Sequence, residues 1–217
     1  MFLQNKTILI VDDHPVLREG LRGLLEQQGD FAICGEIGTV EGALQLVRDT
    51  APDAMIVDIS LGKESGLELI QRARALLPTL AILVLSMHDE MVYAERALRN
   101  GAGGYVMKQE ATTQVVAALR CVLDGRMFVS PAVTERLLNT LARPTSTRPN
   151  YSVDRLTNRE LEVFRLIGTG VTSASIANNL HISRKTVETH RTRIKEKLGA
   201  STAAELVIQA ATWLRDG

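Results

Sequence analysis

The sequence predicts an α/β domain built on a doubly wound, five-stranded parallel sheet, followed by a small all-α domain. Three observations lead to this prediction. The first 125 residues alternate short apolar runs with amphipathic segments, residues 143–154 are rich in Pro, Ser and Thr, and residues 156–212 show only short helical patterns without proline. We therefore expect domains at residues 1–125 and 155–217, joined by a connecting helix and linker at 126–154.

Five apolar runs predict the strands of the sheet. Three of them are almost wholly apolar, as expected of parallel strands that are covered on both faces. The amphipathic segments between them predict the covering helices, and Gly or Pro marks the joins. The expected strands are 7–11, 31–37, 54–58, 81–86 and 104–107, and the expected helices are 15–28, 40–49, 66–76, 90–99 and 112–123.

The helices of the second domain begin and end at characteristic residues. Thr157 and Glu160 fit a capping box at the start of the first helix. Ser183 caps the third helix, and Gly199 ends it. The expected helices are 157–168, 172–180, 183–198 and 201–212, while a further helix at 131–142, with Pro131 in its first turn, lies in the connecting segment.

The composition excludes several classes of protein. Of the 217 residues, 45% are hydrophobic, which is typical of a folded globular chain and not of a disordered one. No apolar run approaches the roughly 20 residues that span a bilayer, and the first residues do not resemble a signal peptide. The two cysteines, Cys34 and Cys121, have no His at metal-binding spacing. We therefore expect a cytoplasmic protein with reduced thiols and no membrane partner.

The charges are divided unequally between the two halves of the chain. Residues 1–142 hold 13 Lys and Arg against 18 Asp and Glu, a net of −5, whereas residues 151–217 hold 10 against 7, a net of +3. An acidic half and a basic half suggest separate tasks. The basic half is the candidate for contact with the phosphates of nucleic acid.

Acidic, hydroxyl and amino side chains stand where the predicted strands end. Asp12 and Asp13 follow the first strand, Asp58 ends the third, Ser86 ends the fourth and Lys108 follows the fifth. Ligands of such sheets bind beyond the carboxyl ends of the strands, so these groups are expected to converge. Clustered carboxylates raise one another's pKa unless a cation neutralises them, and Mg²⁺ prefers such oxygen ligands.

This set of residues predicts phosphoryl transfer to a carboxylate. With Mg²⁺ bound by Asp12, Asp13 and Asp58, the Asp58 carboxylate can attack a phosphoryl donor. Such a reaction needs mainly positioning and charge neutralisation, and Lys108 supplies a compact positive charge. Ser86 can donate a hydrogen bond to an oxygen of the new phosphate.

The segments ILIVDDHPVLREGLRGLL, VDISLGKESGLELI, LVLSMHD and GAGGYVMKQE resemble the successive motifs of response-regulator receivers, which have a flavodoxin-like fold. The resemblance covers roughly residues 6–124. Tyr105 falls at the family's aromatic switch position, where the ring turns inward; the alternative is an edge aromatic that half covers the core. The resemblance implies Asp58 as phospho-acceptor, Asp12 and Asp13 as metal ligands, Ser86 and Tyr105 as switch residues and Lys108 as the family's lysine.

Two departures from the receiver pattern lie close to the site. Leu61 and Gly62 occupy the place of the family's usual Met-Pro pair. Because glycine lacks the fixed φ of proline, we expect a looser loop and a different phosphoryl lifetime. After Lys108, Gln109 and Glu110 stand where a small residue is more common.

The third helix of the second domain has a basic exposed side and follows a short turn after the second helix, which is the helix-turn-helix arrangement. Residues 156–210 resemble the LuxR-type domain of the NarL/FixJ family, most specifically in TVETHRTRIKEKLG. His190 has no metal partner nearby in sequence, so we expect it to be a packing residue. The resemblance places Glu188, Thr189 and Thr192 toward base edges, and Lys185, Thr186, Arg191 and Lys195 mainly toward phosphates.

Two further expectations concern the ends of this domain. The turn GVTSASIA departs from the family's Asn-Lys pair, so one phosphate contact is expected to be missing. The last helix resembles the family's dimerisation helix, with Leu206, Val207 and Trp213 as its apolar material.

Taken together, these features predict a two-component response regulator. A sensor histidine kinase would phosphorylate Asp58, and the phosphorylated chain would form a homodimer on double-stranded promoter DNA. The chain would catalyse only its own phosphoryl transfer and autodephosphorylation. Two alternatives stay open at this point: a haloacid-dehalogenase-like phosphatase, which would show steady phosphate release, and a receiver that is never phosphorylated.

Overall fold

The computed structural model describes residues 5–62, 64–142, 153–180 and 182–216. The predicted linker at 143–152 and His181 of the predicted turn therefore lie outside the described residues. The chain divides into two compact units, Met1–Ala142 and Arg143–Gly217. No helix in the described ranges has both the length and the apolar character needed to cross a membrane.

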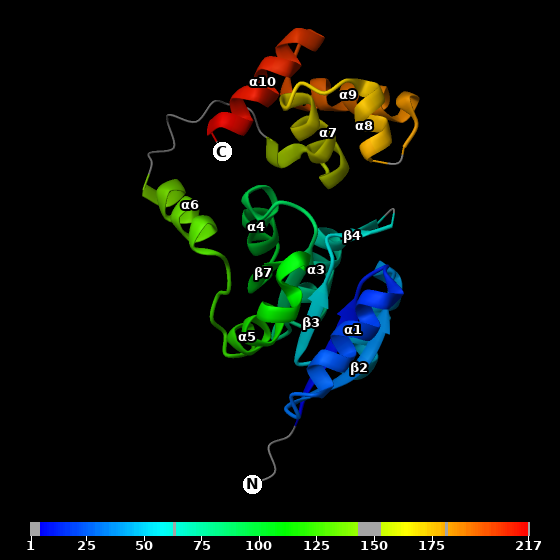
Figure 1. Ribbon diagram of the computed structural model, residues 1–217, viewed down its shortest axis with the longest axis vertical. Coiled ribbons are helices and arrows are strands. Elements are labelled where there is room, and N and C mark those ends of the chain that lie inside the picture. Colours follow the sequence, from blue (N-terminus) through cyan, green and yellow to red (C-terminus); the bar gives the residue numbers. More distant parts are fainter. Residues whose placement is uncertain (1–4, 63, 143–152, 181, 217) are drawn as a thin grey trace. The chain divides into compact units, whose positions relative to one another are not determined.

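The first unit is built on a five-stranded sheet in which every neighbouring pair of strands is parallel (Figure 1). The strand order is β2-β1-β3-β6-β7, so the winding reverses between β1 and β3. This confirms the predicted doubly wound α/β fold and places the ligand crevice beyond the carboxyl ends of β1 and β3. The strands are β1 (Lys6–Val11), β2 (Phe31–Ile37), β3 (Ala54–Val57), β6 (Ala81–Ser86) and β7 (Gly104–Met107).

Helices cover both faces of this sheet (Figure 1). Side chains of α1 and α5 bury one face, where Ile8 and Ile10 of β1 join Leu21, Val115 and Leu119 in one apolar cluster. The helices α2, α3 and α4 follow one another across the other face. The bounds are α1 (Pro15–Glu26), α2 (Val40–Thr50), α3 (Gly66–Leu76), α4 (Glu90–Arg99) and α5 (Ala111–Leu123), each within two residues of the prediction.

A small antiparallel hairpin after β3 was not predicted. It consists of β4 (Ser60–Leu61) and β5 (Glu64–Ser65), with Gly62 in its two-residue loop. Leu61 is buried, and Gly62 has a φ of 61°. The segment forms a hairpin in which glycine adopts the left-handed backbone that a two-residue connection requires. The expected looseness of this loop is a separate property and stays a prediction. The expected change in phosphoryl lifetime stays a prediction.

The helix α6 (Pro131–Ala142) belongs to the first compact unit. Its residue Val133 is buried, and the Arg136 guanidinium donates to the Met91 carbonyl oxygen at 2.6 Å. The Ser130 hydroxyl, just before the helix, donates to the Glu90 carboxylate, also at 2.6 Å. The helix that sequence analysis placed in the connecting segment is therefore attached to the first turn of α4.

The second unit contains the four predicted helices, α7 (Asn158–Gly168), α8 (Ser173–Asn179), α9 (Arg184–Leu198) and α10 (Ala203–Asp216). The predicted capping box is present: the Thr157 hydroxyl accepts from the Glu160 N–H, and the Glu160 carboxylate accepts from the Thr157 N–H. Ser183 caps α9, and Gly199 ends it with a φ of 70°. These contacts explain why the helix starts and stops were predictable.

The three apolar residues of α10 named from the sequence lie in different environments, and the role of this helix in dimerisation stays a prediction. Leu206 is fully buried inside the unit, and the Trp213 ring lies 5.7 Å from that of Phe164. The helices α7 and α10 pack against one another, and a side chain at Gly168 would collide with the Ala210 carbonyl oxygen of α10. Of the apolar residues expected for dimerisation, only Val207 is left exposed, together with its neighbour Ile208.

Candidate functional site

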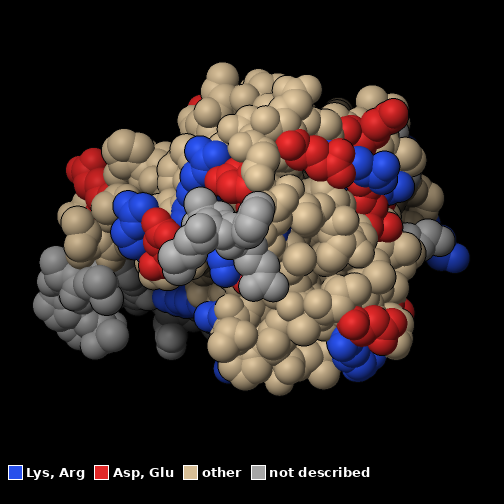
Figure 2. Space-filling view, turned by 90° about the horizontal axis from the view of Figure 1, so that it is seen from below, with Lys and Arg blue, Asp and Glu red and all other residues tan. Residues whose placement is uncertain are grey.

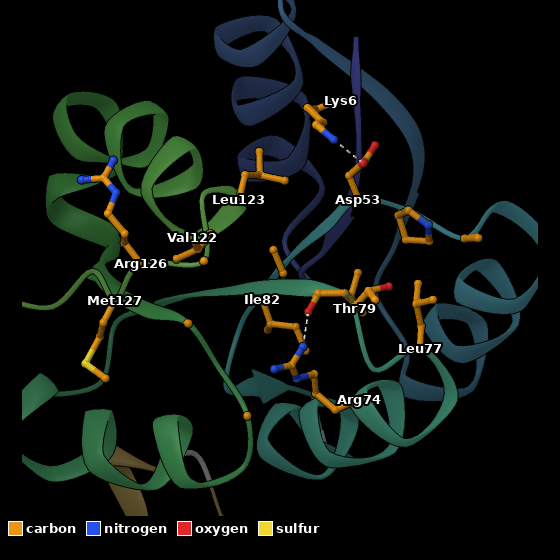
Figure 3. Close-up of a pocket in the computed structure, with 17 residues that line it drawn as sticks. Lys6, Asp53, Arg74, Leu77, Thr79, Ile82, Val122, Leu123, Arg126 and Met127 are labelled. Atoms are coloured by element: carbon orange, nitrogen blue, oxygen red, sulfur yellow. Dashed lines mark hydrogen bonds and ion pairs between the residues drawn. The ribbon is translucent and has the colours of Figure 1, made fainter. Parts of the chain in front are cut away.

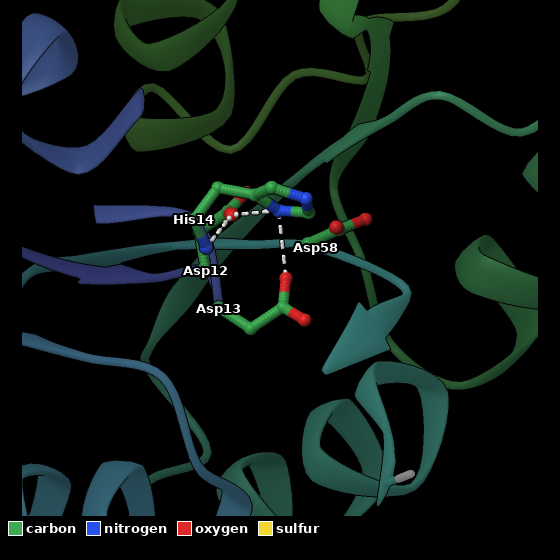
Figure 4. A group of neighbouring side chains, drawn as sticks. All are labelled: Asp12, Asp13, His14 and Asp58. Atoms are coloured by element: carbon green, nitrogen blue, oxygen red, sulfur yellow. Dashed lines mark hydrogen bonds and ion pairs between the residues drawn. The ribbon is translucent and has the colours of Figure 1, made fainter. Parts of the chain in front are cut away.

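The acidic site lies at the carboxyl edge of the sheet, where β1 and β3 end side by side (Figure 4). Asp12 and Asp13 directly follow β1, and Asp58 directly follows β3. Ligand oxygens or nitrogens of Asp12, Asp13, His14 and Asp58 lie within 4.8 Å of one another. Asp12 and Asp58 are buried, whereas the Asp13 side chain is 31% exposed. The predicted carboxylates therefore meet at one site that opens to solvent on the Asp13 side.

Lys108 connects two of these carboxylates. Its ammonium nitrogen lies 2.6 Å from Asp12 Oδ2 and 2.6 Å from Asp58 Oδ2, and its side chain is only 7% exposed. Burial works against the charged form, but hydrogen bonds to Asp12 and Asp58 outweigh it, so the pKa of Lys108 is raised. The site thus holds a fixed positive charge next to Asp58.

The two oxygens of the Asp58 carboxylate differ in their partners. Its Oδ1 is buried and has no hydrogen-bond partner among the described residues, while Oδ2 accepts from Lys108. Burial raises the pKa of the Asp58 carboxyl, and Lys108 opposes this only in part. An unpartnered buried carboxylate oxygen beside Asp12 and Asp13 is what a hard divalent cation would satisfy. The residues present therefore fit a bound metal ion.

His14 is a member of the cluster that sequence analysis did not include. Its ring nitrogen Nδ1 lies 2.7 Å from Asp13 Oδ1 and 3.1 Å from Asp12 Oδ1. Its backbone N–H donates to Asp12 Oδ1 at 2.8 Å. The side chain is 68% exposed, so it covers the open side of the site. Its position directly after the Asp pair was the available signal.

Ser86 and Tyr105 are connected through the backbone of His88. The buried Ser86 hydroxyl accepts from the His88 N–H at 3.2 Å, and the Tyr105 hydroxyl donates to the His88 carbonyl oxygen at 2.8 Å. Burial raises the pKa of Tyr105, so its hydroxyl stays a donor. The ring is only 2% exposed, which agrees with the inward position and not with an edge aromatic that half covers the core.

The His88 side chain ties this switch pair to the hairpin. Its Nε2 lies 2.6 Å from the Ser60 hydroxyl, two residues after Asp58. Sequence analysis missed this contact because the two residues stand 28 positions apart in different loops. The loop after the acceptor and the loop after β6 are therefore joined directly.

The α9 helix presents most of the predicted DNA-contacting residues to solvent. Lys185, Thr186, Glu188, Thr189 and Thr192 are exposed, whereas Arg191 and Lys195 are half-buried. The Thr189 hydroxyl donates to the Lys185 carbonyl at 3.0 Å, and the Thr192 hydroxyl donates to that of Glu188 at 3.1 Å. Both hydroxyls are therefore engaged within the helix. The exposed side of α9 combines cations, one carboxylate and threonine side chains.

His190 lies on the inner side of the same helix. It is half-buried, its Nδ1 has no hydrogen-bond partner in the part of the chain that is described, and burial lowers its pKa. It is not part of the acidic cluster at the sheet edge. These properties agree with the predicted packing role.

Two further features of the described residues carry charged groups that are largely paired. On the face in Figure 2, acidic and basic side chains lie next to one another in small groups. A cavity of about 470 Å³ lies near the amino-terminal ends of the strands, away from the carboxylates (Figure 3). Its charged lining is already paired, because Lys6 contacts Asp53 at 2.8 Å and Arg74 donates to the carbonyl oxygens of Pro78 and Leu80.

Two family models match the chain. Residues 8–120 match the response regulator receiver domain, and residues 154–210 match the bacterial regulatory proteins of the luxR family. The chain is 36% identical over 201 residues to the virulence factors putative positive transcription regulator BvgA of Bordetella pertussis. It is 36% identical over 204 residues to the oxygen regulatory protein NreC of Staphylococcus carnosus. Each alignment covers 92% of this chain and 94% of the relative.

Solved structures of similar architecture include the RcsB response regulator of Salmonella typhimurium. One such structure has a TM-score of 0.56 and 28% identity, and a structure of an RcsB–DNA complex has a TM-score of 0.57 and 28% identity. Both alignments cover 96% of this chain and 98% of the other.

Proposed function

The chain belongs to the NarL/FixJ family of two-component response regulators, and from this premise we propose that phosphorylation of Asp58 by a sensor histidine kinase controls its binding to promoter DNA. It joins a receiver domain to a LuxR-type DNA-binding domain and regulates transcription. One observation above all supports the proposal: a buried Asp58 with an unpartnered oxygen among the described residues contacts Lys108 and lies in one cluster with two further aspartates.

The side chains around Asp58 support a transfer that needs little more than charge compensation. An Asp58 oxygen forms a bond to phosphorus as the bond between phosphorus and the kinase histidine breaks. Lys108, already within 2.6 Å of Asp58, balances the negative charge that arrives with the phosphoryl group. Burial keeps water from surrounding either group, which strengthens this attraction.

The metal in this proposal is Mg²⁺, held by Asp12, Asp13 and Asp58. When bound, it supplies positive charge for the oxygens of the phosphoryl group. The exposed His14 ring must then leave the carboxylates that it now contacts, and its 68% exposure leaves it room to do so.

The switch follows from the hydrogen bonds of Ser86. In the bond to the His88 N–H the Ser86 hydroxyl is the acceptor, so it can donate to an oxygen of the new phosphate and draw the His88 backbone with it. His88 also holds the Tyr105 hydroxyl and Ser60, so the whole loop after β6 responds. Phosphorylation then shifts the population between two arrangements of this loop.

The output is sequence-specific binding of double-stranded DNA by a homodimer in the cytoplasm. Glu188, Thr189 and Thr192 of α9 read base edges, and two half-sites supply affinity that one small domain lacks. Contacts to phosphates come from Lys185, Thr186, Arg191 and Lys195. The only catalysis is the chain's own phosphoryl transfer and its autodephosphorylation.

The test is the mass of the intact protein after incubation with acetyl phosphate, with Mg²⁺ or with a chelator. We expect the wild type to gain one phosphoryl group only with Mg²⁺, and Asp58→Asn to gain none. Asp124→Asn, which changes an exposed aspartate elsewhere, should behave like the wild type. A phosphoryl group on the Asp58→Asn chain would place the acceptor elsewhere. No gain in the wild type, even with a kinase, would remove phosphorylation as the input.

A further inference from the structure

The hairpin β4–β5 places one backbone N–H against the metal site. Its two-residue loop begins at Gly62, and both common loops of this length require a positive φ at that first position. Gly62 has a φ of 61°, and a Cβ added there would meet only Asp13 Oδ2, at 3.9 Å. A proline could not adopt this conformation, because its ring holds φ near about −65°.

The Gly62 N–H donates to Asp13 Oδ2 at 3.0 Å. The other oxygen, Oδ1, faces the cluster, where it now contacts His14 at 2.7 Å. The two oxygens of Asp13 therefore have separate partners, one on the hairpin and one toward the metal site. A hydrogen bond of this kind fixes the rotation of a half-exposed carboxylate that has few other contacts.

The burial of Leu61 and two polar contacts hold the Gly62 N–H in place. Leu61 is 2% exposed, the Ser60 hydroxyl lies 2.6 Å from His88 Nε2, and the Glu64 carboxylate accepts from the Val40 N–H at 3.1 Å. The hairpin is thus attached to the loop after β6 and to the start of α2. Its tip presents the N–H from a fixed position.

We infer that Gly62 is a positioning residue for the metal site, and that its N–H holds the Asp13 carboxylate with Oδ1 directed toward the ion. This inference rests on the proposed Mg²⁺ site. Hydrogen bonds to ligating carboxylates orient them, and their loss costs about 10–100-fold in metal affinity. The glycine at this position therefore makes a contact that a proline, which has no N–H, cannot make.

The experiment measures Mn²⁺ binding to the full chain without any phosphoryl donor, from the paramagnetic resonance signal of free Mn²⁺. Gly62→Pro removes both the N–H and the positive φ, and we expect about tenfold weaker binding. Gly62→Asn is the matched control, since asparagine keeps the N–H and tolerates the left-handed region. It should bind Mn²⁺ much as the wild type does.

Each outcome decides between the proposals. Equal Mn²⁺ affinity of the wild type and a folded Gly62→Pro chain would overturn the role of Gly62 but leave the metal site intact. No binding to the wild type would overturn both. If Gly62→Pro does not fold, the double variant Ser60→Ala, Glu64→Ala keeps Gly62 and every carboxylate of the site while releasing the hairpin. Weaker Mn²⁺ binding by this variant supports the inference, and unchanged binding overturns it.

Discussion

At the scale of single residues, Glu160 shows how a buried charge is stabilised in the DNA-binding unit. It is 2% exposed, and its carboxylate accepts from Lys197 at 2.6 Å and from the Thr157 N–H at 2.8 Å. Burial alone would raise the pKa of Glu160, but these hydrogen bonds outweigh burial and the pKa is lowered. A lowered pKa means that folding favours the ionised carboxylate.

This gives a prediction about pH. The contribution of Glu160 to the free energy of unfolding is complete above the ordinary glutamate pKa of about 4.3 and is lost as the pH falls through the lower folded value. Glu160→Gln keeps the helix cap but loses the charge pair. We expect the free energy of unfolding of this variant to be about 1–3 kcal/mol lower than that of the wild type at neutral pH. This difference should shrink below a pH of about 4.

Urea unfolding followed by Trp213 fluorescence measures this difference. Trp213 is the only tryptophan of the chain, and its ring lies against Phe164. Burial also lowers the pKa of His190, and the charge of Glu160 opposes this shift, so the His190 pKa falls further in the variant. This effect lies at a higher pH, below about 6.5, and is therefore separate from the titration of Glu160. Glu196→Gln, an exposed change on α9, is the control. A difference that persists unchanged at low pH would contradict the charge-pair explanation.

The residues of the acidic site were predictable where strand ends determine their place. Asp12, Asp58 and Lys108 follow directly from the strand pattern, because parallel strands end at one edge. Gly62 and His88 were not predictable in their roles. Their contacts with Asp13 and Ser60 depend on the path of two loops, and no pattern in the sequence specifies that path.

At the scale of elements, the DNA contacts predicted for α9 are of two kinds, charge contacts to phosphates and contacts to base edges. Lys185→Ala removes an exposed cation, so we expect weaker binding to all DNA sequences and a salt dependence whose slope is smaller by about one unit. Glu188→Ala instead removes the carboxylate predicted to face bases. It should change the preference at one base pair by about 1–3 kcal/mol and leave the salt slope nearly unchanged.

Titrations of cognate and altered duplexes at several salt concentrations separate the two effects, and each variant serves as the control of the other. A Lys185→Ala chain with an unaltered salt slope would contradict the assignment of Lys185 to a phosphate. A Glu188→Ala chain with unaltered preferences would exclude base contact by this side chain.

Most elements were predicted because each carries its own local signal. The ends of the helices in the second unit are marked in the sequence by Thr157 with Glu160, by Ser183 and by Gly199. The β4–β5 hairpin was missed because its two-residue strands are too short to show an alternating pattern. The packing of α6 on α4 could not be predicted for another reason. The pattern of an amphipathic helix shows which of its sides is buried, but it does not show which element covers that side.

At the scale of the whole molecule, α6 is the element through which we expect the proposed switch at Ser86 to act. Ser86 ends β6, and His88 lies in the loop that follows. This loop leads directly into α4, whose first turn carries Glu90 and Met91. These two residues hold α6 through Ser130 and Arg136. A displacement of the loop therefore acts on α4 and α6 together, and α6 ends where the linker begins.

The double variant Ser130→Ala, Arg136→Ala tests this connection. It removes both hydrogen bonds to the first turn of α4. The metal-site carboxylates Asp12, Asp13 and Asp58 are unchanged. We expect normal phosphorylation by intact mass, and a gain in DNA affinity on phosphorylation that is smaller by about 0.5–2 kcal/mol. Glu135→Ala, an exposed change on the same helix, should keep the full gain. If the double variant also keeps the full gain in DNA affinity, the response to phosphorylation does not need the α4–α6 contact. The pairing of receivers alone must then bring the DNA-binding domains together.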